Sequence, residues 1–295
     1  FYVWVNIYGL MATSLLWLLA NAVFDARTAR RVFGIIGSGG IAGAILGGLF
    51  TGRAAQLLRT DNLLLVCAAL LFLVLALLAG VKPGPAAADD DRDSTASDQS
   101  VLGIVWRSDL LRAVAGMAAL TALVTTIVDV QFNAAVDAAF PSRDGKTAFF
   151  GSFFAYLSIA ALLFQVLLVP RILTRVGVGT GLAVLPLSLG LGSLGVLALP
   201  GLAGGIMAKL GDGTFRYSIH KAATEILYVP VPALAKRRTK VFLDTTVDNL
   251  ATGLGAALIL ALTSGLGVSY PRLSLLSLGL VVAWLALTVR ARRAY

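Results

Sequence analysis

Residues 62–81 read NLLLVCAALLFLVLALLAGV, a run of twenty residues without a charge. As an α-helix, a run of this length crosses the ~30 Å hydrocarbon layer of a bilayer. Similar apolar runs, bounded by charged residues or by Gly and Pro, recur along the chain. We expect nine membrane-spanning segments, over residues 1–24, 31–51, 62–81, 110–129, 147–170, 178–199, 202–228, 239–264 and 273–290.

The composition of the 295-residue chain agrees with this interpretation. Hydrophobic residues make up 58%, charged residues only 13%, and the mean hydropathy is +0.87. Soluble domains carry roughly 25% charged residues, so this chain has too little charge to cover a globule, which excludes a soluble single-core enzyme. We predict an all-α, polytopic membrane bundle. The net charge of +9 fits basic cytoplasmic loops and a lipid environment rather than nucleic-acid binding.

One polar stretch divides the chain. Residues 82–100, KPGPAAADDDRDSTASDQS, are acidic, contain proline and lack the apolar residues that a packed core needs. We therefore predict a largely disordered linker over residues 82–107. It separates three helices in residues 1–81 from six in residues 108–295.

The distribution of Lys and Arg predicts the orientation in the membrane. We place the loop after the first segment in the cytoplasm and alternate the sides from there. Because basic loops are retained in the cytoplasm, the linker and the C-terminus should both be cytoplasmic, and we expect a bacterial inner membrane. Apart from segment 202–228, the opposite side then holds only Arg53, Arg59, Arg143, Lys146 and Arg272.

A weak internal repeat extends this scheme. The tripeptides at 31–33 (RVF) and 240–242 (KVF) each open an apolar segment after a basic loop, and each leads into a helix rich in Gly and Ala. Transporters are commonly built from repeated helix groups, so the repeat favours two six-helix halves. Because the chain starts with FYVWV and no Met, we expect three further helices to precede it, with nine of twelve present.

Small residues mark a packing face in the second segment. The stretch GIIGSGGIAGAILGG, residues 34–48, carries Gly39, Gly43 and Gly47 at four-residue spacing. In a membrane, such spacing lets two helix backbones approach closely, so we predict that these three glycines pack against another helix. A phosphate-binding loop is not indicated, because no Lys-Ser/Thr follows.

Charged residues within apolar segments are the candidate functional residues, because lipid tolerates them only when they are paired or hydrated. One stripe shares a single helix face and must face a cavity or a partner helix; it consists of Lys209, Asp212, Arg216 and His220. Two interpretations stay open, a pathway that attracts anions or structural ion pairs such as Asp212 with Arg216. The candidate pathway residues are Asp129, Asn133, Lys209, Asp212, Arg216, Lys221, Glu225 and Asp244.

The sequence contains no enzyme constellation. It has one His and one Cys, no HExxH or GxSxG motif, and no spacing typical of metal ligands. His220 lies near the expected cytoplasmic end of its segment, where we expect it to be hydrated. We therefore predict that the protein is not an enzyme and uses no metal or cofactor.

Residues 216–258, RYSIHKAATEILYVPVPALAKRRTKVFLDTTVDNLATGLGAAL, resemble the signature region of the nucleotide transporter family, the ATP/ADP translocases of intracellular bacteria and plastids. The family pattern runs approximately KYSLFDPxKEMAYIPL, a basic loop, then KxxxDVVGGRLGKSGG. TTIVDVQFN, residues 125–133, resembles the family's NLVEVTWK, and residues 29–48 resemble its glycine-rich fifth helix. In the signature region the agreeing residues are Tyr217, Ser218, Glu225, Tyr228, Pro230, Lys240, Asp244 and Gly253.

The resemblance implies a twelve-helix fold of the major facilitator type. It also implies a secondary transporter that moves a nucleotide or related anionic solute by alternating access. In such a protein Arg216 would attract phosphate, while Asp129 and Glu225 would form state-dependent pairs or carry coupling charge. The stretch RILTRVG, residues 171–177, resembles a short basic loop of facilitators, which implies a gating role for Arg171 and Arg175.

The sequence departs from the family pattern at three positions where the family has basic residues. A nucleoside triphosphate carries about four negative charges, and basic groups are how a protein would hold it. Two alternatives therefore stay open: a non-transporting sensor or scaffold attached to a soluble domain, or a facilitator for a non-nucleotide solute. The three positions are Asn133, Thr224 and Asn249.

Overall fold

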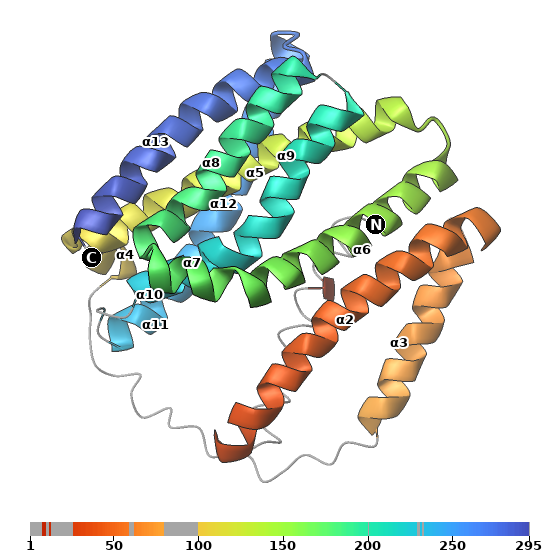
Figure 1. The fold of residues 1–295 in the computed structure, drawn as a ribbon, viewed down its shortest axis with the longest axis horizontal. Coiled ribbons are helices and arrows are strands. Elements are labelled where there is room, and N and C mark those ends of the chain that lie inside the picture. Colours follow the sequence, from red (N-terminus) through yellow and green to blue (C-terminus); the bar gives the residue numbers. More distant parts are fainter. Residues whose placement is uncertain are drawn as a thin grey trace.

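The computed structural model describes residues 8, 9, 12, 26–58, 62–79, 100–199, 201–228, 231 and 233–294. Within these ranges every regular element is a helix and none is a strand, which confirms the all-α prediction (Figure 1). The α-helices are α2 (Ala26–Leu58), α3 (Leu63–Ala79), α4 (Val101–Arg107), α5 (Asp109–Ala139), α6 (Arg143–Leu167), α7 (Val169–Arg175), α8 (Val178–Ala198), α9 (Leu202–Phe215), α10 (Lys221–Leu227), α11 (Ala233–Val241), α12 (Asp248–Leu260) and α13 (Leu273–Ala294). Three π-helical turns, η3 (Arg216–His220), η4 (Phe242–Val247) and η5 (Ala261–Gly265), and one 3₁₀ turn, η6 (Tyr270–Arg272), join them.

Five helices of the described part are long and apolar enough to cross a membrane: Asp109–Ala139, Arg143–Arg175, Val178–Ala198, Arg238–Gly265 and Tyr270–Ala294. Each coincides with a predicted segment, and together they support an integral membrane protein. Of the other predicted segments, 31–51 lies within α2, and 62–81 forms α3, whose apolar part Leu63–Leu77 is shorter. Segment 202–228 is helical but carries charges along its length, and segment 1–24 lies almost entirely outside the described residues.

Residues 109–294 form a bundle of long helical rods. Some rods consist of several elements in line: α6 runs on into α7, α9 through η3 into α10, and α11 through η4 into α12 and η5. The α5–α6, α8–α9 and α12–α13 connections lie at the upper and right end of the bundle in Figure 1. α4, α7, α11 and the C-terminal end of α13 lie at the opposite end. The chain therefore alternates between two ends, as a polytopic bundle does.

Local sequence signals define where these rods begin and turn. The Ser108 hydroxyl accepts a hydrogen bond from the Leu111 N–H at 3.3 Å, and Ser142 caps α6 in the same way. These side chains satisfy backbone donors that a helix start leaves free. Gly201, between α8 and α9, has φ of +107°, a backbone conformation that glycine adopts without strain. This allows the sharp reversal that the PG dipeptide predicts.

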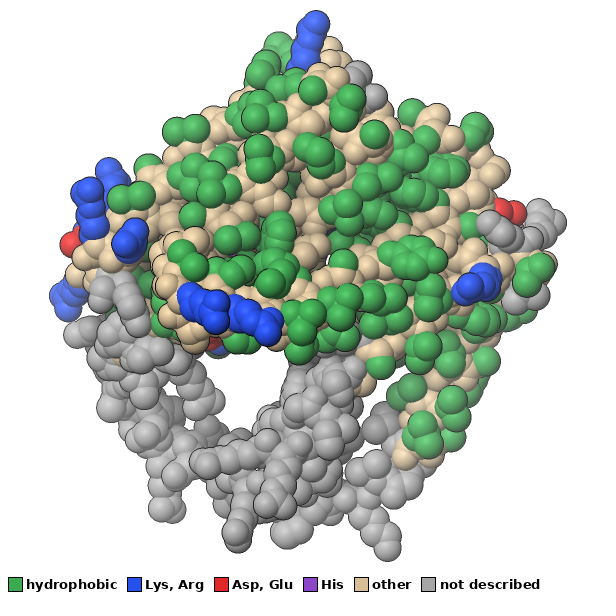
Figure 2. Space-filling model, viewed as in Figure 1, with side chains coloured by type: hydrophobic (Ala, Val, Ile, Leu, Met, Phe, Trp, Pro, Cys, Tyr) green, Lys and Arg blue, Asp and Glu red, His purple; other side chains and the backbone are tan. Residues whose placement is uncertain are grey.

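The core and the outer surface differ as expected for a bundle in lipid. Met117, Leu182, Leu185, Leu189 and Trp284 bring α5, α8 and α13 together and are fully buried. Figure 2 shows hydrophobic side chains spread across the outer face, whereas Lys and Arg gather mainly at the lower left, where α7 and the C-terminus lie. An apolar outer face is what a helical membrane bundle presents to lipid.

Glycines let α8 and α9 lie almost in contact. A Cβ at Gly192 would stand 2.6 Å from Cα of Ala208, and one at Gly204 would stand 2.8 Å from Cα of Val196. Real Cβ atoms do not come so close to backbone, so only glycine fits. This packing fixes α9, which carries Lys209 and Asp212.

Helix α2 packs on α6 through a glycine face different from the predicted one. A Cβ at Gly39, Gly43 or Gly47 would meet no described atom within 4 Å. The face that contacts α6 contains Gly48 and Gly52.

The sequence could not choose between these faces, because α2 carries two ladders of small residues at four-residue spacing. The second ladder, one residue later, is Gly40, Ala44, Gly48 and Gly52. It is the one turned toward α6. Packing of Gly39, Gly43 and Gly47 against another helix stays a prediction.

This contact predicts a position-specific loss of stability. A Cβ at Gly151 would lie 2.5 Å from the Gly52 nitrogen, so Gly151→Leu must push α2 and α6 apart. We expect a loss of about 1–3 kcal/mol or more, seen as a lower melting temperature in detergent. The matched control is Gly43→Leu, which should melt like the wild type. Equal melting temperatures for the two variants would contradict this α2–α6 packing.

Candidate functional site

Two cavities meet at Arg216 and Tyr217, which line both. We call the first the Lys221 cavity, of about 250 Å³; its polar lining includes Thr121, His220, Lys221, Thr224, Asp244 and Asp248. We call the second the Lys209 cavity, of about 450 Å³; its polar lining includes Asp129, Ser158, Gln165, Lys209 and Asp212. The α9–η3–α10 rod therefore contributes charged residues to both.

A π-helical turn divides the predicted charged stripe between the two cavities. In η3 the helix widens and the residues that follow rotate about its axis, so that His220 and Lys221 line one cavity while Lys209 and Asp212 line the other. A second π turn, η4, carries Asp244 to the Lys221 cavity. Turns of this kind are rare and often occur at functional sites. A uniform α-helical periodicity does not predict them.

Lys209 is shared by two carboxylates. Its Nζ lies 2.8 Å from Oδ2 of Asp212, three residues later on α9, and it also contacts Oδ1 of Asp129 on α5. The Asp212 side chain is only 3% exposed, whereas that of Asp129 is 45% exposed. Oδ1 of Asp212 is buried and has no hydrogen-bond partner among the described residues. The cluster ties α9 to α5 and leaves one buried acceptor unsatisfied.

Arg216 does not form the ion pair with Asp212 that one of the two interpretations included. Its guanidinium lies 3.8 Å from Oδ1 of Asp248 on α12, and not against Asp212, which Lys209 occupies. It also lies 5.3 Å from the centre of the Tyr217 ring. The Asp248 pair is at the long end of ion-pair distances, so the contact is loose and Arg216 can exchange partners.

The remaining charges link α10 to the next rod near its start. Nζ of Lys221 lies 3.1 Å from Asp244 and 3.6 Å from Glu225, and Nζ of Lys240 lies 2.7 Å from Glu225. Lys221 and Asp244 line the Lys221 cavity, but Glu225 lines neither cavity. The Lys221–Asp244 and Lys240–Glu225 pairs cross between the α9–α10 and α11–α12 rods, so a relative movement of the rods must break them.

His220 is buried, contrary to the expectation of a hydrated side chain. It is 8% exposed and packs edge-to-face on Trp284, with 5.5 Å between ring centres. Its Nδ1 and the hydroxyl of Thr224 have no hydrogen-bond partner in the described part of the chain. Both residues line the Lys221 cavity, although these two atoms themselves are buried.

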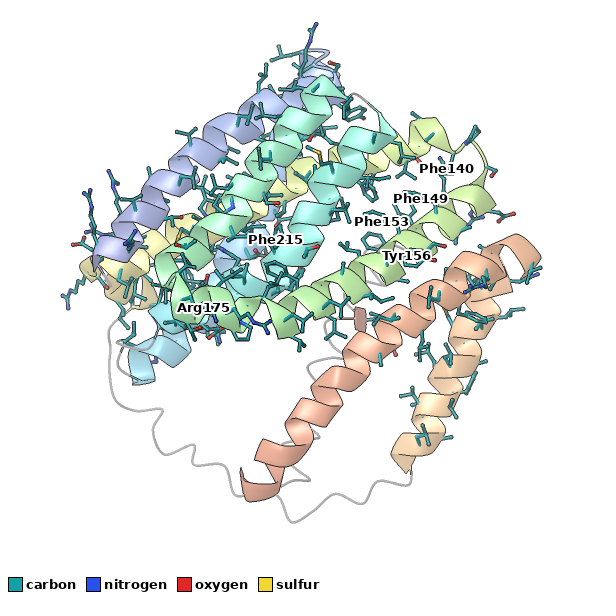
Figure 3. All side chains as sticks on the ribbon, in the orientation of Figure 1. Phe140, Phe149, Phe153, Tyr156, Arg175 and Phe215 are labelled. Atoms are coloured by element: carbon teal, nitrogen blue, oxygen red, sulfur yellow. The ribbon has the colours of Figure 1, made fainter. Side chains whose placement is uncertain are left out.

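Phenylalanines connect α5 and α6 beside the Lys209 cavity. The buried ring of Phe132 lies 4.8 Å from that of Phe153, and Phe149 stacks on Phe140 at 4.9 Å. Figure 3 shows Phe149 and Phe153 projecting from α6 toward the bundle. These ring contacts pack α5 against α6, and no sequence pattern predicted them.

Besides Glu225, three candidates lie apart from the cavities. Asn133 is exposed one turn beyond Asp129. Arg171 and Arg175 are exposed on α7, where Arg171 bonds the Leu167 carbonyl of its own helix and Arg175 lies at the basic end (Figure 3). Sequence reasoning did not select Asp248 as a site residue, although its four-residue spacing from Asp244 was the available signal. Within the described ranges, no group of three His, Cys, Asp or Glu side chains could hold a metal ion.

The helices and charged cavities define a helical integral membrane protein. The chain is 26% identical over 202 residues to ADP,ATP carrier protein 2, chloroplastic, of Arabidopsis thaliana, an alignment covering 61% of this chain and 32% of the carrier. The aligned part thus spans about a third of that relative's length. No family model matches the chain, and no solved structure matches it.

Proposed function

We propose that the protein is a secondary transporter of the nucleotide-translocase type, which moves a nucleotide or related anionic solute by alternating access. The observation that carries this proposal is the position of Arg216 between two cavities, with a loose ion pair to Asp248. A guanidinium offers a planar fork of donors that matches phosphate oxygens. The similarity to a chloroplastic ADP,ATP carrier supports the same class of solute.

In this mechanism the solute replaces a carboxylate at each cation. Its phosphate groups displace Asp248 from Arg216 and compete with the carboxylates that hold Lys209 and Lys221. The freed carboxylates then pair differently, and the rods that carry them move. Such competition gives modest affinity and ready release, as a transporter needs. When the Lys221–Asp244 and Lys240–Glu225 pairs form between the rods, they would close the transport path on their side of the membrane.

The proposal includes a larger architecture. Residues 1–81 would be the last three helices of a first six-helix half, 82–107 a cytoplasmic linker, and 108–295 a second half of major facilitator type. The linker and C-terminus would face the cytoplasm of a bacterial inner membrane. The alternation of the rods and the basic end of the bundle support this orientation (Figures 1 and 2).

The charge balance of the cavities favours a second candidate function. Lys209, Arg216 and Lys221 face the carboxylates of Asp129, Asp212, Asp244 and Asp248, so the lining has no excess of positive charge. A facilitator for an uncharged or zwitterionic solute would need no such excess.

Ligand-dependent melting distinguishes the two candidates. A ligand that binds only the folded protein stabilises it, by about 2.7 kcal/mol at a hundredfold excess over Kd. We expect ATP and ADP to raise the melting temperature of the purified full-length protein in detergent, and adenosine at the same concentration to leave it unchanged. If neither nucleotide raises it, the nucleotide proposal is wrong and the second candidate is favoured.

A further inference from the structure

The buried carboxylate of Asp212 lacks a partner for one of its two oxygens. Lys209 satisfies Oδ2, but Oδ1 has no hydrogen-bond partner among the described residues. Leaving a buried acceptor unsatisfied is costly, and more so for a charged group. Asp129, Lys209 and Asp212 together carry one more negative charge than positive. Both facts indicate a missing positive charge at this place.

The elements packed against α9 supply no other cation there. α8 contains no titratable residue, and α5 contributes Asp129. On α6, Arg143, Asp144 and Lys146 lie in the first turn, far along the helix from the cavity-lining residues at 154–165, and Tyr156 is exposed. Two cations of its own rod line the same cavity as Asp212. One is Lys209, and the other is Arg216, which pairs with Asp248.

The missing charge suits a proton better than a metal cation. The ammonium group of Lys209 already lies against both carboxylates and would repel Na⁺. Na⁺ would also need a shell of several oxygen ligands, whereas a proton needs only Oδ1. Protonated Asp212 would be neutral, which its 3% exposed side chain favours.

We propose that Asp212 is a proton-binding site, loaded when the anionic solute takes Lys209 from it. A phosphate oxygen of the solute accepts the hydrogen bonds of Lys209 Nζ, and Asp212 loses its only cation. One proton then binds Oδ1, and it leaves when the solute departs and Lys209 returns. The coupling step rests on the proposed transport function, whereas the proton site requires only that the solute bind and take Lys209. One proton would accompany each solute.

The proton site is tested without any transport assay. At neutral pH, where exposed carboxylates are ionised, infrared spectra of the wild-type protein in lipid with ATP minus without ATP should contain a carboxylic-acid C=O band that Asp212→Asn removes. The matched control is Asp137→Asn, because Asp137 pairs with Lys146 at the far end of α5 and should leave that band in place. A band that persists in Asp212→Asn overturns the proton site. Should Asp212→Asn not fold, Asp212→Glu takes its place: its band must shift in frequency, and an unshifted band overturns the proposal.

The coupling is tested by ATP accumulation in proteoliposomes. With one proton per solute, an inward gradient of one pH unit should raise steady-state ATP accumulation about tenfold, and Asp212→Asn should abolish this response. An unchanged response in Asp212→Asn, or a response to a Na⁺ gradient instead, overturns the coupling. If the wild type takes up no ATP but the infrared band is present and Asp212-dependent, the proposed function fails and the proton site stands.

Discussion

Arg216→Gln should abolish ATP uptake by proteoliposomes while the protein still folds. Glutamine keeps a polar side chain in the path but removes the guanidinium that both cavities share. Asp248 loses its partner, yet its side chain is 38% exposed and can be hydrated, so stability should change little. Removing one member of a charge pair in a binding site costs about 2–5 kcal/mol, which corresponds to a loss of about 30-fold or more in uptake.

Two companion variants define what Arg216 does. Arg216→Lys keeps the charge but not the planar fork of donors, so it should retain only part of the uptake. Arg272→Gln is the control, because Arg272 is exposed in η6, before α13, and lines neither cavity. This variant should transport like the wild type. Wild-type uptake in Arg216→Gln would refute the role of this residue in binding phosphate.

Lys209→Met should cause the largest loss of stability of any single charge removal in the cavities. The substitution leaves the carboxylate of Asp212 buried and unpaired, since only 3% of that side chain is exposed. Breaking a buried pair in this way costs about 3–5 kcal/mol. We expect a strongly reduced melting temperature and yield in detergent at neutral pH.

A matched surface pair gives the control for this prediction. Lys146 and Asp137 lie 2.6 Å apart, but the Asp137 side chain is 65% exposed, so Lys146→Met should cost less than about 1 kcal/mol. The double variant Lys209→Met with Asp212→Asn removes the orphaned charge and should recover most of the lost stability. Equal melting temperatures for Lys209→Met and Lys146→Met would show that Lys209 does not hold a buried carboxylate.

The sequence predicted the rods well because their signal is strong and local. Apolar runs bounded by charges located all five spans between Asp109 and Ala294, although the first span runs to Ala139, ten residues beyond its predicted end. The same reasoning placed Lys209 and Asp212 toward a cavity, because lipid excludes unpaired charge. These inferences depend only on composition and spacing along one helix.

The pairings could not be predicted, because they depend on how rods rotate and approach one another. The π turn at Arg216–His220 changes the register of the residues that follow it, and Lys209 occupies Asp212, so that Arg216 meets Asp248 on α12. Likewise, two glycine ladders on α2 share one spacing, and only packing selects Gly48 and Gly52. His220 is buried because Trp284, far along the chain, covers it.

The most direct measurement of the proposed function is counterflow of labelled ATP. Proteoliposomes of the full-length protein are filled with unlabelled ATP and placed in trace labelled ATP, so that either an exchanger or a proton-coupled carrier accumulates the label. We predict a transient, saturable accumulation that external ADP inhibits and adenosine does not. Label that stays at the level of protein-free liposomes, in preparations whose folding is verified by melting, would contradict a nucleotide transporter.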